Sequence, residues 1–519
     1  MTDLFEKSAQ HLAAVQVTDM NTLYPSTFEE FLRETERGNV VPVVRTVLAD
    51  LQTPVSAFLR LADGARHAFL LESVEGGERV ARYSFLGANP EMIVRGRRRT
   101  TVIERGDGLT ERLEGVHAVD FLRRYFGEKK LARRSGLAPF AGGAVGFLAY
   151  DAARWFEPVL DRGDEATEDE ARVMFFRTVL AFDRARQQIA ITTVVFTDEA
   201  SGDVGRLRAL YEAAANETER IERKLNDSSP LKVGSRRRAA TPPCFRANWT
   251  REGFQEAVQR AREYIFAGDC YQVVLSQRFT TEVTADPVEI YRALRVLNPS
   301  PYMFFLRFGE EAIIGASPEM LVRCRGQRLD YRPIAGTRKR GATEAEDWLL
   351  GEEMRADEKE VAEHMMLVDL GRNDLGRVAD FGSVEITDLM TIEKYSHVQH
   401  LVTGLRARLR DDLDRFDALA SCFPAGTVTG APKVRAMQII DELEPSRRGI
   451  YAGTVFYADY ADNLDSCIAI RTMHLRRDRA EVQAGAGIVA DSVPEREYEE
   501  TVNKASALLR AIEWAENGL

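Results

Sequence analysis

The chain has 519 residues, of which 45% are hydrophobic and 29% are charged, and its formal net charge is -11 at pH 7. This length permits a large core and two or more domains, and the composition is ordinary for a soluble globular protein. The negative charge argues against a nucleic-acid-binding surface, although it leaves room for a small basic pocket. No apolar run reaches membrane-spanning length, and the opening stretch MTDLFEKSAQHLAAVQ lacks a secretory signal pattern. We therefore expect a cytoplasmic protein.

The cysteines predict neither disulfides nor a zinc site, because none are paired in CxxC spacing and their number is odd. We expect them to be small buried apolar residues. They are Cys244, Cys270, Cys324, Cys422 and Cys467.

The first half of the chain is predicted to be rich in strands. Residues up to about 35 look helical and polar. From Val40 to about Phe196, β-branched and aromatic runs such as VSAFLRL, HAFLLES, AVGFLAY and QIAITTVVF are separated by turn residues, which predicts strands. A helix is then expected from Asp203 to about Leu225.

A linker separates this N-terminal region, residues 1–225, from a C-terminal region, residues 246–519. Residues 226–245 include NDSSPLKVGSRRRAATPP, which is rich in Ser, Pro and Arg and has no periodicity. The second region opens with a helix that Thr250 caps, and strands and helices then alternate irregularly. With no repeat and no regular βαβ rhythm, the fold class is predicted as α+β with mixed, mostly antiparallel sheets.

The stretch DEKEVAEHMMLVDLGRNDLGR, residues 357–377, is predicted to form one amphipathic helix that ends near Gly371. On that helix Glu360 and Glu363 are three residues apart, so both carboxylates share a face beside His364.

A second acidic pair with the same spacing, Glu497 and Glu500, lies in REYEETVNKASALLRAI. If the two pairs converge, four carboxylates make a hard oxygen-ligand site suited to Mg²⁺. Taken alone, such pairs are more often a solvated face held in salt bridges, and Lys359 and Lys504 are available as partners.

One basic stretch and one histidine-containing stretch each allow a functional and a structural interpretation. RPIAGTRKRG, residues 332–341, suits either an anion held by backbone N–H groups or a solvated basic loop. YSHVQHLVTGL contains His397 and His400, which are either core residues or acid/base groups near neutral pH.

Two glycine-containing stretches are candidates for binding a carboxylate. In FPAGTVTGAPKVRAMQIIDELEP a small-residue loop precedes a helix that starts after Pro432, and amides at a helix start favour anions. GxxxxGK[ST] is not met there, so ATP hydrolysis is not implied. QAGAGIVADSVP superficially fits GxGxxA, but residues 491–494 interrupt the required helix, which excludes a dinucleotide site. Arg471, at a strand end, is a candidate bidentate carboxylate ligand.

Together these stretches resemble the chorismate-utilising enzymes, and among them the family of anthranilate synthase large subunits (component I). The resemblance covers nearly the whole chain, in the expected order: LLESVEGGERVARYSFLG, NPSPYMFF, GASPE, RPIAGTR, the acidic helix, FPAGTVTGAPKVRAM and GAGIVADSVPEREYEETVNKA. It implies a sandwich of large antiparallel sheets with helices outside. It also implies a lyase that converts chorismate and ammonia to anthranilate and pyruvate, the first step of tryptophan biosynthesis.

The resemblance also implies roles for individual residues. Mg²⁺ would be held by Glu363 and Glu500, with Glu360 and Glu497 as further ligands or neighbours. Glu319, in GASPE, would protonate the leaving hydroxyl, which requires a raised pKa. His400 would act in the step that eliminates pyruvate. The substrate site would be lined by Gly336, Thr337, Thr427, Tyr451, Arg471, Gly485, Ala486, Gly487 and Lys504.

Two positions separate this chain from relatives with other products. Relatives that add water and make isochorismate carry a lysine base where this chain has Gln272. Aminodeoxychorismate synthase reads PIKGT, whereas Ala335 stands here in PIAGT. Both differences favour anthranilate. A catalytically dead, tryptophan-responsive regulatory homologue is the alternative of another class, and the presence of all four glutamates, Glu319 and His400 argues against it.

The nitrogen source is predicted from the lack of an amidotransferase nucleophile motif in the sequence. A class I amidotransferase needs a nucleophilic Cys in a Gly-x-Cys-x-Gly turn with a His partner, and no cysteine here has that context. We expect the chain to use free ammonia, or glutamine through a separate amidotransferase subunit (component II), in a heteromer.

The early LLES resembles the family's tryptophan feedback element, which pairs with NPSPYM, and its alternative is a plain strand end. A pocket of Tyr, Met and a serine hydroxyl suits an indole amino acid, L-tryptophan, as inhibitor. Relatives place a lysine after this element where Gly76-Gly77-Glu78-Arg79 stands here, so no contact beyond Ser73 is assigned. The candidate residues are Leu71, Glu72, Ser73, Pro301, Tyr302, Met303, Val455 and Tyr457.

Overall fold

The computed structural model describes residues 22–74, 82–161, 163, 168–231, 243–395 and 398–519. His397, the run 76–79 and most of the predicted linker lie outside these ranges. No helix within them is long and apolar enough to cross a membrane. Of the polar helical stretch expected before residue 35, the described part contains a short strand followed by a helix, Phe28–Thr35.

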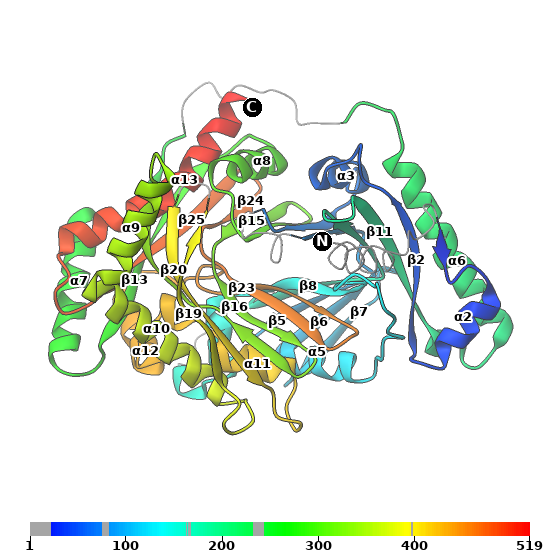
Figure 1. Cartoon of the computed structure of the whole chain (residues 1–519), viewed down its shortest axis with the longest axis horizontal. Coiled ribbons are helices and arrows are strands. Elements are labelled where there is room, and N and C mark those ends of the chain that lie inside the picture. The colour runs from blue at the N-terminus through cyan, green and yellow to red at the C-terminus, as the bar shows by residue number, and fades with distance from the viewer. Residues whose placement is uncertain (1–21, 75–81, 162, 164–167, 232–242, 396–397) are drawn as a thin grey trace, which may run out of the picture.

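The described strands form two large antiparallel sheets, packed face to face with helices outside (Figure 1), which confirms the predicted α+β sandwich. The first sheet contains, in spatial order, β1 (Leu23–Tyr24), β2 (Val40–Leu48), β11 (Gln188–Phe196), β10 (Thr178–Asp183), β4 (Tyr83–Ala88), β3 (His67–Glu72), β14 (Tyr302–Phe308), β15 (Glu311–Ser317), β24 (Thr472–Arg476), β25 (Arg479–Ile488), β13 (Gln272–Glu282) and β12 (Arg246–Ala247), with β21 (Gly430–Ala431) beside β13. The second contains β18 (Ile334–Lys339), β20 (Val398–Arg408), β17 (Arg328–Tyr331), β16 (Met320–Arg325), β23 (Asn463–Ile468), β22 (Thr454–Asp459), β8 (Gly143–Leu148), β9 (Ala171–Phe176), β5 (Met92–Arg97), β6 (Thr100–Arg105) and β7 (Thr110–Glu114), with β19 (Glu385–Lys394) beside β20.

Both halves of the chain contribute strands to both sheets. In the first sheet β3 pairs with β14, with Leu71 opposite Phe304. In the second sheet β8 pairs with β22, with Phe147 opposite Val455. The N-terminal strands therefore complete the C-terminal sheets, an arrangement that the sequence pattern left open.

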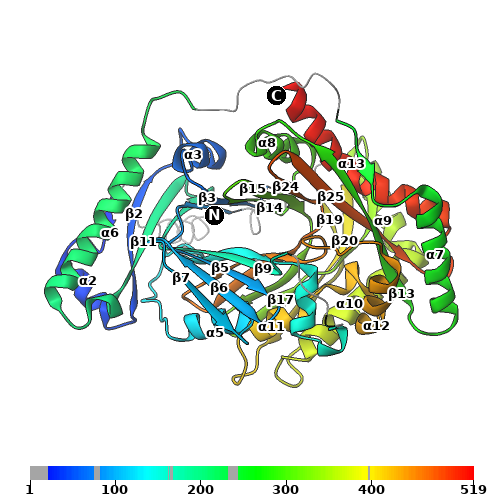
Figure 2. The ribbon, with the colours of Figure 1, turned by 180° about the vertical axis from the view of Figure 1, so that it is seen from behind.

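Helices cover the outer faces of the sandwich (Figures 1 and 2). They are α2 (Phe28–Thr35), α3 (Pro54–Leu61), α5 (Ala118–Gly127), α6 (Val204–Leu225), α7 (Arg251–Phe266), α8 (Pro287–Leu297), α9 (Glu344–Ala356), α10 (Glu358–Gly376), α11 (Arg415–Cys422), α12 (Lys433–Leu443) and α13 (Pro494–Asn517).

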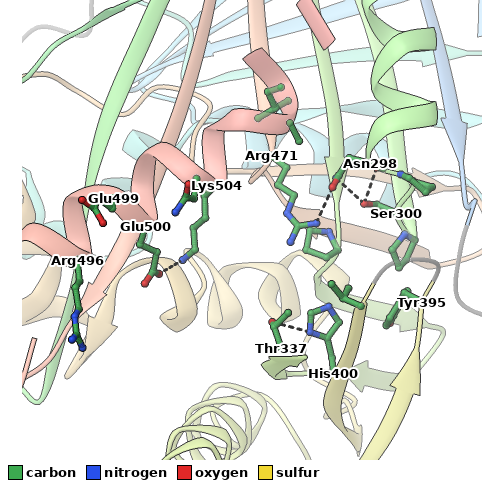
Figure 3. Close-up of a pocket in the computed structure, with 17 residues that line it drawn as sticks. Asn298, Ser300, Thr337, Tyr395, His400, Arg471, Arg496, Glu499, Glu500 and Lys504 are labelled. Atoms are coloured by element: carbon green, nitrogen blue, oxygen red, sulfur yellow. Dashed lines mark hydrogen bonds and ion pairs between the residues drawn. The ribbon is translucent and has the colours of Figure 1, made fainter. Parts of the chain in front are cut away.

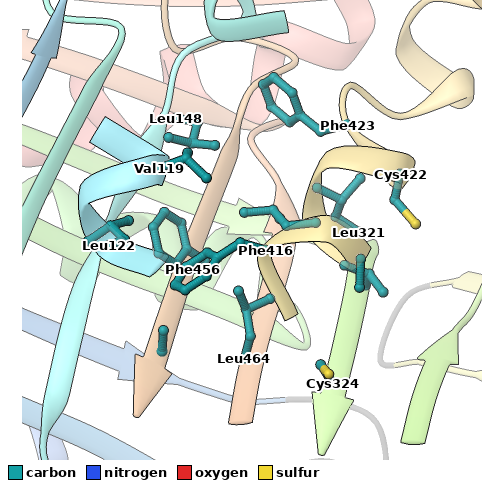
Figure 4. Close-up of a cluster of buried hydrophobic side chains, with 14 of the residues drawn as sticks. Val119, Leu122, Leu148, Leu321, Cys324, Phe416, Cys422, Phe423, Phe456 and Leu464 are labelled. Atoms are coloured by element: carbon teal, nitrogen blue, oxygen red, sulfur yellow. The ribbon is translucent and has the colours of Figure 1, made fainter. Parts of the chain in front are cut away.

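The apolar core has three main layers, because each sheet buries both of its faces. Aromatic side chains such as Phe69, Phe147 and Phe304 fill the space between the sheets. Helices α3, α8 and α13 close the outer face of the first sheet. Helices α5 and α11 close that of the second, where Leu122 and Phe416 pack over Phe456 and its neighbours (Figure 4).

Three local predictions were wrong. VSAFLRL forms helix α3, not a strand, because Thr53 and Ser56 make a reciprocal capping box and Pro54 starts the first turn. The acidic helix continues past Gly371 to Gly376. Gly371 is required for close packing, since a Cβ there would lie 2.5 Å from the Tyr331 ring. Cys244 is exposed, whereas the other four cysteines are buried.

The structure confirms the one predicted helix cap and shows two more. Thr250 caps α7 and Asp203 caps α6 through side-chain acceptors for backbone N–H groups. Asp357 does the same for α10, where it accepts from the amides of Lys359 and Glu360. Helix α12 begins immediately after Pro432, as predicted.

Candidate active site

A cavity of about 580 Å³, called here the first cavity, lies between α13 and the ends of strands from both sheets (Figure 3). Five of the predicted site residues line it together: Thr337 of β18, His400 of β20, Arg471 just before β24, and Glu500 and Lys504 of α13. Residues separated by more than 160 positions in the sequence thus face one space.

His400 is held as a neutral imidazole with one nitrogen available. Its Nδ1 lies 2.7 Å from the carbonyl oxygen of Gly336 and 3.2 Å from the hydroxyl of Thr337. Because a carbonyl only accepts, Nδ1 carries the proton and Nε2 keeps its lone pair. Burial lowers the pKa of His400, which favours this neutral form. A bulge between Ala335 and Arg338 in the pairing of β18 with β20 aims Gly336 and Thr337 at the ring.

Glu319 has a buried carboxyl group that can act as an acid near neutral pH. It directly follows Pro318, which lines the first cavity. Burial raises the pKa of Glu319 to about 7, while the Thr427 hydroxyl, Lys504 and Arg471 oppose the rise. Within the described chain, one carboxyl oxygen of Glu319 and the hydroxyl of Thr427 have no hydrogen-bond partner. Buried polar groups are normally paired, so this is a place where a ligand could complete the bonding.

The predicted glycine turn at residues 485–487 is wrong, because this segment is part of strand β25 and pairs with β13. Lys504 donates from Nζ to the carbonyl of Gly485 at 3.1 Å. A Cβ on Gly485 would come within 2.6 Å of the Tyr451 hydroxyl, and one on Gly487 within 2.5 Å of the Gln272 side-chain nitrogen. Glycine is therefore required at both positions for the close approach of these polar groups. Ala486 points the other way, into an apolar cluster under α7 and α12.

Gln272 and Tyr451 are both buried polar groups that do not line the first cavity, and Tyr451 instead lines a separate cavity of about 600 Å³. The side-chain oxygen of Gln272 is buried and has no partner among the described residues. Burial raises the pKa of Tyr451 to about 12, so its phenol is protonated and can donate a hydrogen bond.

Arg471 is a half-buried cation whose guanidinium makes one weak hydrogen bond to the described part of the protein. Its Nη1 lies 3.4 Å from the side-chain oxygen of Asn298, and burial lowers its pKa. Its backbone has φ +48°, a left-handed conformation that is uncommon for a non-glycine residue and frequent at functional sites. A largely desolvated guanidinium facing a cavity suits a bidentate carboxylate.

The acidic residues of α10 and α13 come together at the edge of the site. Burial raises the pKa of Glu363, and the negative charges of Glu360 and Glu500 raise it further. Burial also raises the pKa of Glu497, and Glu500 adds to the rise. Carboxylates from two helices thus destabilise one another's charge.

Two cations of the chain already engage this cluster. Lys504 Nζ lies 2.6 Å from Glu500, and Arg338 lies 2.7 Å from Glu360. Lys359 instead pairs with Asp491, at 3.0 Å on the surface. Among the described residues no three His, Cys, Asp or Glu side chains are arranged to hold a metal ion. The donor set still fits Mg²⁺, which is commonly bound by one or two carboxylates, with water and substrate oxygens completing its shell.

A second cavity, of about 300 Å³, lies between the sheets where the two halves of the chain meet. All eight residues predicted from the tryptophan element line it: Leu71, Glu72, Ser73, Pro301, Tyr302, Met303, Val455 and Tyr457. The hydroxyl of Ser73 is buried without a partner among the described residues. Arg323 binds Asp465 at 2.8 Å, and the Tyr302 hydroxyl binds the same carboxylate at 3.2 Å.

The carboxylate of Glu72 is already hydrogen-bonded to other residues of the protein. It accepts from the Tyr291 hydroxyl at 2.6 Å and from Arg295 at 3.0 Å, and its side chain is fully buried. Successive strand residues face opposite sides, so the side chains of Leu71 and Ser73 lie on the opposite face from that carboxylate.

Several cavity residues were missed by the sequence analysis. Asn298 and Ser300 line the first cavity, whereas only the last three residues of NPSPYM were assigned a role, in the tryptophan element. Pro301 lines both cavities. Tyr395 also lines the first, with its ring edge-on to His400 at 5.5 Å between centroids. The only feature of the sequence that could have indicated Tyr395 is its position five residues before His400.

The match to a family model gives the class of this protein. The model described as chorismate binding enzyme matches residues 66–510, most of the chain. The chain therefore belongs to the chorismate-binding enzyme family.

Named relatives narrow the assignment. Anthranilate synthase component 1 of Acetivibrio thermocellus is 47% identical over 95% of this chain and 99% of its own length, and that of Aquifex aeolicus is 44% identical over 94% and 98%. The crystal structure of anthranilate synthase component I from Streptococcus pneumoniae matches with a TM-score of 0.73 and 36% identity, and covers 89% of this chain and 99% of its own. Within the family, the chain groups with the anthranilate synthase component 1 proteins.

Proposed function

We propose that the chain is the catalytic large subunit of anthranilate synthase, which converts chorismate and ammonia to anthranilate, pyruvate and water. One observation carries the proposal. A neutral imidazole, His400, and the guanidinium of Arg471 line one cavity, and the buried acid Glu319 follows Pro318 of its wall and lies within electrostatic reach of Arg471. These groups match the needs of a dicarboxylate that must lose a hydroxyl and then a proton.

In the first step ammonia adds at ring C2 and the C4 hydroxyl departs. Glu319 protonates the departing hydroxyl, which leaves as water. A carboxyl group with a pKa of about 7 is half protonated at neutral pH, which suits a general acid. Arg471 would bind one substrate carboxylate, and Gly485 and Gly487 would lie along the part of the substrate that carries the other.

In the second step His400 Nε2 takes the proton from C2. The bond between C3 and the enolpyruvyl oxygen breaks, the released enolpyruvate gains a proton to become pyruvate, and the ring becomes aromatic. The Nδ1–H bond to Gly336 fixes the tautomer that leaves Nε2 free to act as a base.

We further propose that Glu363 and Glu500 hold Mg²⁺, with Glu360 and Glu497 beside it. The bound ion would neutralise the ring carboxylate of chorismate as charge develops. Lys504 and Arg338 would release Glu500 and Glu360 when the ion binds. The mutual rise in carboxylate pKa supports this assignment, because a divalent cation would relieve the repulsion.

The nitrogen would come from free ammonia or from glutamine through a component II amidotransferase in the cytoplasm. No cysteine lies in a nucleophile turn, and four of the five are buried. L-Tryptophan is proposed as a feedback inhibitor that occupies the second cavity, where Ser73 offers an unpartnered hydroxyl and Tyr302 and Met303 offer apolar surface.

The decisive experiment incubates the purified chain with chorismate and Mg²⁺, and adds either ammonium or glutamine. We expect anthranilate, identified by fluorescence and mass, together with pyruvate in equal amount, from ammonium only. Aminodeoxychorismate or isochorismate as product would overturn the reaction assignment. Full turnover of glutamine by the chain alone would overturn the assignment of a partner subunit.

Aminodeoxychorismate synthase is the second candidate, and one position argues against it. Ala335, where those enzymes carry a lysine, is buried in β18 opposite Leu401 of β20. An alanine there can supply neither a nucleophile nor a base.

A further inference from the structure

A buried ion pair joins the end of α10 to the beginning of α12. Lys433 Nζ lies 2.9 Å from each carboxylate oxygen of Asp374. The two side chains are only 14% and 2% exposed, respectively. Burial raises the pKa of Asp374 and Lys433 opposes the rise. Neither residue has a role in the proposed reaction, and neither lines the first cavity.

The pair clamps the loop 423–432, which connects α11 to α12 and is called here the keystone loop. One side of this loop presses on α10. Its short helical turn, Gly426–Val428, lies so close that a Cβ on Gly426 would be 2.9 Å from the Leu370 side chain. The ion pair lies on the same helix, at residue 374, one turn after that contact.

The other side of the keystone loop pairs with β13. The carbonyl of Thr429 accepts from the amide of Val274, and that of Ala431 from the amide of Tyr271, both at 2.8 Å. A Cβ on Gly430 would lie 2.1 Å from the carbonyl oxygen of Gln272. The loop is therefore held between the acidic helix and the strand that carries Gln272.

The middle of the keystone loop reaches the proposed acid. Thr427 is close enough to Glu319 to influence its pKa. Tyr331 is buried near both ends of this arrangement, since burial raises its pKa and Asp374 and Glu319 raise it further.

We propose that Asp374 and Lys433 are positioning residues, whose ion pair locks the keystone loop between α10 and β13 and so keeps Thr427 opposite Glu319 and Gln272 at Gly487. A buried ion pair adds little net stability compared with an apolar pair of similar size, because desolvation offsets the attraction. Its contribution here is geometric, because one ammonium bound to both oxygens of a carboxylate fixes the start of α12 against α10.

The test compares the Asp374→Leu/Lys433→Met double variant with the wild-type chain and with Glu516→Gln. The control removes a comparably buried carboxylate that binds the 284–285 amides at the far end of α13. Hydrogen exchange is measured by mass spectrometry on peptides covering 271–275 and 423–432. Turnover of chorismate and ammonium is measured in parallel.

In the double variant we expect an unfolding temperature close to that of the wild type and faster exchange at the Tyr271 and Val274 amides. We expect kcat to fall about tenfold to a hundredfold, with a smaller change in KM, since small displacements of catalytic groups have effects of this size. Wild-type kcat and wild-type exchange in a folded double variant would overturn the proposal.

The milder Asp374→Asn variant keeps the shape and one acceptor oxygen, and it serves if the double variant does not fold. Unchanged exchange and unchanged kcat in this variant also overturn the proposal. The effect on turnover rests on the proposed function, whereas the effect on exchange does not. If the wild-type chain fails to convert chorismate, the proposed function is wrong. Hydrogen exchange would then remain as the test of the Asp374–Lys433 ion pair.

Discussion

The two cavities of the sandwich are built in opposite ways. The first is lined by residues 298–508, all from the C-terminal region, and it gathers charged groups such as Arg471, Glu500 and Lys504. The second is shared between the halves of the chain, since β3 and β4 lie beside β14 in one wall and β16, β22 and β23 form the facing wall. Apolar and aromatic side chains dominate it.

Under the proposed function, the difference shows how one fold separates the catalytic site from the site that binds the inhibitor. Catalysis by charged groups requires that those groups are held on one rigid framework. A pocket formed by both halves of the chain instead changes its shape when the halves move relative to each other. Pro301 lines both cavities, at the start of β14. Under the proposed function, tryptophan in the second cavity would act on the first through this strand. The predictions below test the division.

The largest expected effect is on Glu363. We expect Glu363→Gln to lower kcat by about a thousandfold or more, because several kcal/mol of charge stabilisation by the proposed ion would be lost. Stability should not fall at pH 7. The folded pKa of Glu363 is raised by burial, Glu360 and Glu500, so its stabilising contribution disappears as pH rises through that value, and the neutral amide avoids the repulsion.

Steady-state kinetics and thermal melts check this prediction. The matched control is Glu358→Gln, which changes an exposed glutamate on the first turn of the same helix. Wild-type kcat in Glu363→Gln would remove the metal assignment from α10.

The next effect is on Glu319. We expect Glu319→Gln to lower kcat by about 10²- to 10⁴-fold, the usual contribution of a general acid. In the wild type, kcat should decline as pH rises above about 7, where this acid loses its proton. Stability linked to Glu319 is fully present below the unfolded pKa, near 4.5, and is lost as pH rises through about 7.

A pH–kcat profile and urea titrations at several pH values measure both effects. The glutamine variant should lose this part of the pH dependence of stability. An alkaline decline in kcat that persists unchanged in a highly active Glu319→Gln variant would assign the acid to another group.

A smaller effect, confined to regulation, is expected from the second cavity. Ser73→Ala should weaken inhibition by L-tryptophan about tenfold, the equivalent of one lost hydrogen bond, and should leave kcat without tryptophan unchanged. Inhibition curves on wild type and variant, with direct calorimetric binding of tryptophan, give the measurement. Equal inhibition of both proteins would argue that tryptophan binds elsewhere, and a loss of basal kcat would break the proposed separation of the two cavities.

The smallest effect is expected at the surface between α10 and the residues before α13. Lys359→Ala breaks the exposed pair with Asp491 and should change the free energy of unfolding by no more than about 0.5 kcal/mol, since water screens such pairs. Urea denaturation measures this, and kcat should remain that of the wild type. A large loss of activity would show that Lys359 belongs to the site.

Local sequence patterns predicted much of the secondary structure. The caps at Thr250 and Asp203 and the helix after Pro432 depend only on neighbouring residues, so the sequence contains the whole signal. The strand wrongly predicted at VSAFLRL shows what local patterns cannot decide, because a short apolar run fits a strand or a buried helix equally well. At Gly371 the local stop signal was overridden by the contact with Tyr331, 40 residues away in the chain.

The sequence by itself determined the family, the α+β class, eight of the residues that line the second cavity and five of those that line the first, because long motifs carry residue types in a fixed order. Only the tertiary structure decided how the halves interleave, which of the NPSPYM residues faces which cavity, and that the Glu72 carboxylate is committed to Tyr291 and Arg295. The physical reason is that strand pairing and burial join residues hundreds of positions apart. The acidity of Glu319, the free nitrogen of His400 and the clamp at Asp374 all arise from those distant neighbours.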